Sequence, residues 1–133
     1  MPRATIVKEE LSEKNIRFFA IYIETKNAVL VFLSEAEDQL GTLAASVPSA
    51  TELLVQPLLS SVLLGDRNTV MARMLAERLA AKTGKIGLVS VHLRTVGETE
   101  ATPVLIKLFE RVTTTSSEEG QAQAHREGGS IST

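Results

Sequence analysis

The stretch IRFFAIYIETKNAVLVFLS, residues 16–34, carries the strongest structural signal in the sequence. Two runs rich in Ile, Val, Phe and Tyr flank a polar break at residues 25–27, a pattern typical of a β-hairpin. Both alternating faces of each run are apolar, with Phe18 and Tyr22 on one side of the first run and Ile21 on the other. Such a hairpin is expected in the middle of a sheet, covered on both faces by this chain or by a partner.

Shorter apolar segments predict further strands. Residues 40–47 indicate a third, weaker strand, and residues 86–94 indicate a strand with alternating apolar side chains. Residues 53–64 are interrupted by Pro57, so we expect a single strand after that proline.

Residues 68–83 change to helical spacing. Met71, Leu75 and Leu79 form one apolar stripe, and the alanines between them suit a helix that packs closely. Gly84 stands where the glycine of a helix C-cap is expected. The segment therefore predicts an amphipathic helix that ends at this glycine.

A second amphipathic helix is expected to begin at Thr102 and Pro103, as cap and first helical residue, and to end near Val112. Residues 113–133 then contain Ile131 as their only large apolar residue, so we expect them to be disordered. The predicted organisation is a polar N-terminal segment (residues 1–14), one domain (residues 15–112) and a disordered tail (residues 113–133).

Composition excludes several classes of protein. The 133 residues contain no cysteine, which excludes disulfides, thiolate metal sites and a cysteine nucleophile, and two histidines are too few for a histidine-rich metal cluster. The net charge of −2 comes with both signs mixed along the chain, so a nucleic-acid partner is not expected. The N-terminus is too polar for a signal peptide, and no apolar run reaches membrane-spanning length. We therefore expect a cytoplasmic or nuclear protein without a membrane partner.

The corner SVLLGDRNT, residues 61–69, admits two interpretations. A strand, a Gly-Asp turn and a helix can hold an anion, but no second glycine or lysine of a phosphate loop is present and Asp66 would repel an anion at the helix start. As a structural turn, Gly65 lets the chain reverse, and Asp66 or Asn68 can cap the helix. We favour the structural turn and keep a small anion- or ligand-binding domain as the alternative.

No set of residues predicts catalysis. Ser90, His92 and an aspartate could in principle form a triad, but no serine lies in a G-x-S-x-G turn. The carboxylates of residues 35–38, like Glu98 and Glu100, are expected on solvated loops, without the apolar surroundings that acid–base pairs need. We predict no catalytic residue, cofactor or metal, and expect the excess apolar surface to contact another chain.

The stretch SSVLLGDRNTVMARMLAERLAAKTGKIGLVSVHL, residues 60–93, resembles the signature region of the proteasome assembly chaperone 4 family. The related type-3 chaperone shares a looser version of this motif. The positions that carry the resemblance are expected to be mainly structural; they are Leu63, Leu64, Gly65, Asp66, Leu75, Arg78, Leu79, Lys82, Thr83 and Lys85.

The resemblance implies an α+β fold, an antiparallel sheet of about six strands packed with two main helices. It implies a non-enzymatic chaperone for assembly of the 20S proteasome core particle. Such a chain pairs with a type-3 assembly chaperone, and the heterodimer binds a proteasome α-type subunit, at the α5 position by analogy, and promotes α-ring formation.

Two groups of residues are the predicted contacts with these partners. The hairpin is expected to pack against the second chaperone, and polar helix residues are expected to meet the α subunit, although a solvated helix face would explain the same charges. The hairpin residues are Phe18, Ile21, Tyr22, Val31 and Phe32, and the helix residues are Arg73, Glu77 and Arg78.

Overall fold

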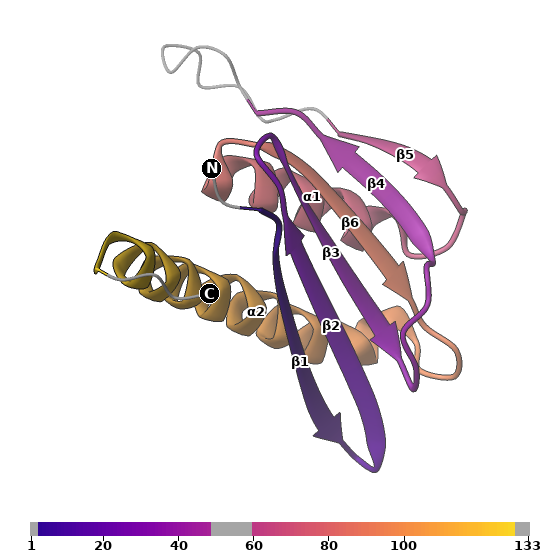
Figure 1. Cartoon of the computed structure of the whole chain (residues 1–133). Helices are drawn as coiled ribbons and strands as arrows, with labels where there is room; N and C mark the ends of the chain where they lie inside the picture. The colour runs from indigo at the N-terminus through magenta and orange to yellow at the C-terminus, as the bar shows by residue number, and fades with distance from the viewer. Residues whose placement is uncertain (1–2, 49–59, 130–133) are drawn as a thin grey trace.

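The computed structural model, which describes residues 3–48 and 60–129, shows a six-stranded sheet with two helices behind one face (Figure 1). The strand order is β1-β2-β3-β6-β4-β5. This confirms the predicted α+β class. The elements are β1 (Thr5–Glu13), β2 (Ile16–Glu24), β3 (Ala28–Glu35), β4 (Thr42–Ser46), β5 (Ser60–Leu64), α1 (Thr69–Thr83), β6 (Ile86–His92) and α2 (Glu98–Gly129).

The predicted hairpin is confirmed as β2 and β3, which pair antiparallel across the turn at residues 25–27. The expectation of a purely antiparallel sheet was wrong at one place, because β3 and β6 run parallel. β5 and β6 both pair antiparallel with β4, so they run in the same direction. Helix α1 connects the end of β5 to the start of β6, which lies between β4 and β3. A further strand was predicted within residues 53–64. Of these, residues 53–59 lie outside the described part of the chain.

The sheet begins earlier than predicted. Residues 1–14 were expected to precede the domain as a polar segment, but β1 forms an edge strand paired along the full length of β2. An edge strand needs only one apolar face: Val7 is buried and Leu11 half-buried, whereas Lys8 and Glu10 are exposed. Charges on an edge strand also discourage pairing with other chains.

Helix α1 matches its prediction, and its C-cap is confirmed. Gly84 has a φ of 69° and its N–H donates to the carbonyl of Ala80 at 2.8 Å. The predicted side-chain cap at the other end was wrong: Asn68 adopts a left-handed conformation and makes no cap hydrogen bond through its side chain. Its carbonyl instead accepts the N–H of Ala72 at 3.0 Å.

Helix α2 is longer than predicted at both ends. It begins at Glu98, where the N–H of Ala101 donates to the carbonyl of Gly97, and Pro103 lies inside it. It continues to Gly129 through residues that were expected to be disordered. Adding residues to an existing helix costs far less than starting one, and Glu, Gln, Ala and Arg of this segment favour helix. Neither described helix is long and apolar enough to cross a membrane.

The core lies between the helices and one face of the sheet. Leu75 and Leu79 of α1 and Phe109 of α2 are completely buried there. The small residues of α1 allow close approach: a Cβ on Gly87 of β6 would lie 2.7 Å from the carbonyl oxygen of Ala76. Close packing of this kind fills the space between α1 and the sheet.

Candidate protein-binding surface

No described helix covers the second face of the sheet, since both helices lie behind the first (Figure 1). The loop after β3 covers this face only locally, where Ser34 and Ser90 are buried. Its side chains are apolar and half-buried along four strands. We call this surface the open sheet face; it comprises Phe19, Ile21 and Ile23 of β2, Leu30 and Phe32 of β3, Leu43 and Ala45 of β4, and Leu88 of β6.

The strand register makes the open sheet face continuous. Ile21 lies opposite Phe32, and Ile23 lies opposite Leu30, across β2 and β3. Leu30 in turn lies opposite Leu88, which lies opposite Ala45 of β4. Side chains at paired positions are in contact range, so these residues form one apolar band across the middle of the sheet.

Charged residues border this band on the side of β1. Lys8 and Glu10 lie opposite Ile21 and Phe19 in the register of β1 and β2. Arg17 pairs with Glu10 at 2.6 Å, and its guanidinium lies 5.1 Å from the centre of the Phe19 ring. An apolar centre with a charged rim is the usual composition of a protein–protein interface.

Two serines on the same face have structural roles. Ser90 is buried and its Oγ accepts the N–H of Gly41 at 2.8 Å, and Ser34 exchanges hydrogen bonds with the backbone of Gln39. His92 Nε2 is buried without a hydrogen-bond partner among the described residues. Ser90 is therefore held by the backbone and is not paired with His92 as a nucleophile would be.

The predicted hairpin interface divides between the two faces. Ile21 and Phe32 lie on the open sheet face, as a partner interface requires. Phe18, Tyr22 and Val31 are at most 3% exposed and point toward the helices, so they belong to the core of this chain. Apolar residues on both faces made this assignment impossible from the hairpin alone.

The three predicted helix contacts are tied to neighbouring elements. Arg73 Nε donates to Ser60 Oγ at 3.0 Å, and Ser60 Oγ in turn donates to the Glu77 carboxylate. Arg78 contacts Glu110 of α2 at 3.3 Å. These side chains hold α1 against β5 and α2, and their contact with an α subunit stays a prediction.

Several positions of the family motif also have structural contacts. Lys82 Nζ lies 3.5 Å from Glu110 and donates to Thr113 Oγ1 at 3.0 Å, which joins α1 to α2. Lys85 Nζ contacts the carboxylate of Glu24 at 2.6 Å and so ties the end of α1 to β2. Thr83 Oγ1 donates to the carbonyl of Leu79 at 2.7 Å within α1, and Leu75 and Leu79 are core residues.

The Leu-Leu-Gly-Asp part of the motif is exposed. Leu63 and Leu64 are 54% and 50% exposed, at an irregular position of the β4–β5 ladder. Gly65 has a φ of 88°, and a Cβ there would lie 2.5 Å from Thr42 Oγ1. The glycine is therefore needed for the turn and for close approach to β4, while Asp66 is exposed.

Glu35, which was predicted to lie on a solvated loop, is a structural residue. It ends β3, is 3% exposed, and its carboxylate accepts the N–H groups of Arg94, Thr95 and Val96 together with the hydroxyl of Thr95. Burial opposes ionisation, but these hydrogen bonds outweigh it and lower the pKa of Glu35 from 4.5 to about 2. Glu35 thus fixes the loop that leads into α2.

These observations define a small α+β protein-binding domain, with a closed core on one side of its sheet and an apolar open face on the other. No cluster of metal-ligating side chains occurs among the residues that the structure describes. The model of the family called proteasome assembly chaperone 4 matches residues 17–93, more than half of the chain. The chain belongs to that family, which is a family of assembly chaperones and not a class of enzymes.

The fold is similar to that of a chain in a crystal structure of a chaperone complex for yeast 20S proteasome assembly. The TM-score is 0.64 at 10% sequence identity, over 87% of this chain and 97% of that chain. At this identity the similarity shows the fold alone. A search of curated proteins finds no match.

Proposed function

We propose that this chain acts as one subunit of a heterodimer with a type-3 assembly chaperone, and that the heterodimer binds an α-type subunit and promotes assembly of the α-ring of the 20S proteasome core particle. The α5 position is the proposed site in that ring. Family membership supports the assembly role, and the similar fold in a yeast assembly complex supports action as part of a complex. We place this activity in the cytoplasm and the nucleus.

The open sheet face is the observation that carries the proposal. A partner with the same fold would present an equivalent apolar face, and two such faces pack at a distance of roughly 10 Å. The eight apolar residues of this surface span four strands that lie side by side in the sheet, so they present one continuous apolar area to a partner. Apolar interfaces of this kind are typical of lasting subunit contacts.

Contact with the α subunit must be reversible, because an assembly chaperone leaves when the next subunits cover its position. A more polar surface suits a transient contact. The charged residues of α1, Arg73, Glu77 and Arg78, are the proposed site. By occupying one surface of a subunit, the chaperone excludes incorrect neighbours through steric clash.

The first test is affinity purification of the tagged chain from its native cell, followed by mass spectrometry. We expect a second small chaperone and free α subunits, without mature β subunits. Recovery of the second chaperone without α subunits would contradict the α-ring role, and recovery of neither would contradict the proposal as a whole.

A matched pair of variants tests the open sheet face. Ile21→Lys places a charge in the middle of the apolar band and should lower affinity for the partner chaperone by at least about tenfold. The control is Val70→Lys on α1, where the side chain is already 73% exposed. Both variants should keep the circular dichroism spectrum of the parent. Equal binding by Ile21→Lys and Val70→Lys would exclude the open sheet face as the interface.

No described feature favours the alternative of an anion-binding domain. The exposed Asp66 carries a negative charge next to the start of α1, where it would oppose a bound anion. Asn68, at the N-cap, has a left-handed backbone. The presence of Gly65 is explained by its positive φ and by its close approach to Thr42, without a bound ligand.

A further inference from the structure

A row of apolar side chains crosses five of the six strands. It begins on edge strand β1 and follows paired positions through β2, β3 and β6 to β4, on the side of the open sheet face. No charged residue interrupts it, so a partner can lie flat on it across the sheet. We call these residues the apolar row; in strand order they are Ile6, Ile23, Leu30, Leu88 and Ala45.

Ile6 is the member of the row that the fold of this chain does not explain. It is 57% exposed, whereas its neighbour Val7 is buried and faces the helices. Edge strands commonly carry charges that prevent pairing with other chains, as Lys8 and Glu10 do on the same side of β1. An exposed isoleucine that continues an apolar row onto the edge strand therefore indicates contact with another molecule.

The other end of the open sheet face is obstructed by the connection from β3 to β4, residues 36–41. β6 lies between these two strands, so the connection must cross it. It crosses on the open side, because the N–H of Gln39 donates to Ser34 Oγ and that of Gly41 donates to Ser90 Oγ. Both serines are fully buried there. Two packed sheets lie roughly 10 Å apart, and the connection takes up part of that space at this end.

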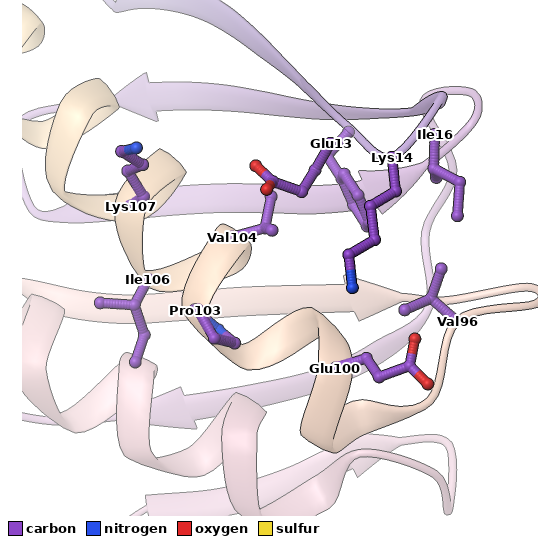
Figure 2. A pocket seen from close by; sticks show the side chains of 10 residues that line it. Glu13, Lys14, Ile16, Val96, Glu100, Pro103, Val104, Ile106 and Lys107 are labelled. Atoms are coloured by element: carbon purple, nitrogen blue, oxygen red, sulfur yellow. The ribbon is translucent and has the colours of Figure 1, made fainter.

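Charged residues surround the β1–β2 turn at this same end. On the open side, Arg17 pairs with Glu10 at 2.6 Å. On the helix side, a cleft of about 570 Å³ lies between the turn and the first turns of α2 (Figure 2). This end is therefore suited to solvent, and the end that carries the apolar row is suited to a partner. The charged residues that line the cleft, two carboxylates and two ammonium groups whose charges cancel, are Glu13, Lys14, Glu100 and Lys107.

We propose that the partner chaperone packs a sheet off centre on the open sheet face, over the apolar row, with Ile6 in direct contact and the end beneath the β3–β4 connection left uncovered. This contact rests on the proposed heterodimer and specifies its geometry. The apolar area extends about 19 Å along the row, at about 4.8 Å between strands, and about 14 Å along β3 from Ala28 to Phe32. A single helix, about 10–12 Å wide, would leave part of this area exposed, whereas a second sheet covers it.

The test compares two positions of β1 on the same side of the sheet. Ile6→Glu places a charge in the apolar row, and Ser12→Glu places the same charge at the other end of β1, opposite Arg17. Both positions are exposed, so both variants should keep the circular dichroism spectrum of the parent. The type-3 chaperone recovered with the tagged chain is titrated with each by isothermal titration calorimetry. We expect Ile6→Glu to lower the affinity at least about tenfold and Ser12→Glu to change it less than about twofold.

The variant Ile21→Lys separates this geometry from the proposed heterodimer itself. If Ile21→Lys loses affinity and Ile6→Glu does not, the off-centre contact is refuted and the heterodimer stands. A loss for Ser12→Glu as large as that for Ile6→Glu would also overturn the off-centre contact, because the partner would then cover both ends of β1. If Ile21→Lys and Ile6→Glu both bind like the parent, the open sheet face is not the interface and both proposals fail, as they do if no second chaperone is recovered.

Discussion

Replacement of Glu35 by Gln should remove a large, pH-dependent part of the stability of this domain. The pKa of this buried carboxylate, lowered from 4.5 to about 2, corresponds to about 3 kcal/mol at about 1.4 kcal/mol per unit. Gln keeps the size of the side chain but turns an amide N–H₂ toward the donors of Thr95, so part of the hydrogen-bond network is lost as well. We therefore expect Glu35→Gln to lower the free energy of unfolding by about 3 kcal/mol at pH 7.

The sign of the pH dependence follows from the direction of the shift. Because the pKa is lower in the folded than in the unfolded chain, the stabilisation is complete above pH 4.5 and is lost as the pH falls toward 2. At pH 3 roughly 1 kcal/mol should be left, and near pH 2 almost none. The difference between parent and variant should shrink accordingly on acidification.

Urea unfolding of the parent, of Glu35→Gln and of a control at several pH values measures this difference. The control is Glu37→Gln, an exposed carboxylate two positions along the chain, which should change stability by less than about 0.5 kcal/mol. A loss for Glu35→Gln that is equal at pH 7 and pH 3 would refute the assignment to the lowered pKa. A loss no larger than that of the control would refute the structural role of Glu35.

Two further substitutions test the core and the turn before α1, both by urea unfolding. Leu79→Ala, at a fully buried position, should lower the free energy of unfolding by roughly 2–5 kcal/mol. Its control, Val70→Ala at a position 73% exposed, should change this free energy by less than about 0.5 kcal/mol. Similar losses in the two variants would contradict the placement of α1. Gly65→Ala should cost more than about 2 kcal/mol because its Cβ would lie 2.8 Å from the Cα of Thr42. Gly84→Ala has free space and should cost only about 1 kcal/mol, so the reverse order would contradict the described turn.

The elements that could be predicted are those whose signals are local. The hairpin, the helix of residues 69–83 and the strand after it follow from apolar spacing and from Gly84 at the helix end, and each appears close to its predicted position. β1 was missed because four of its nine residues are charged, and an edge strand of this kind is recognisable only once β2 is known to lie beside it.

Features that depend on long-range pairing could not be predicted. The parallel pairing of β3 with β6 comes from the crossover through α1, which no local pattern indicates. This pairing also explains why Glu35 was misplaced: parallel strands end at the same edge, so the end of β3 meets the loop after β6. The available signal was a glutamate at the end of a buried apolar run. Its structural role could be inferred only once the strand order was known.

The sequence could not divide the hairpin residues between core and candidate interface, because this division also depends on long-range packing. Alternation separates the two faces, but it does not say which face meets the helices when both are apolar. Only the packing of α1 and α2 assigns Phe18, Tyr22 and Val31 to the core and leaves Ile21 and Phe32 on the open sheet face.

The open sheet face is difficult to explain by the needs of this fold alone. Sheets that pack helices on one face commonly carry polar residues on the other, and polar side chains at Ile21, Leu30 and Leu88 would leave the core contacts of the helices intact because these positions face away from them. An apolar band there costs solubility and adds nothing to the closed core. Sequence patterns that break the expected alternation without benefit to the fold are found where function requires them. A face that becomes fully buried only against another chain is what the proposed heterodimer requires, and under that proposal the partner chaperone would add to the stability of this domain.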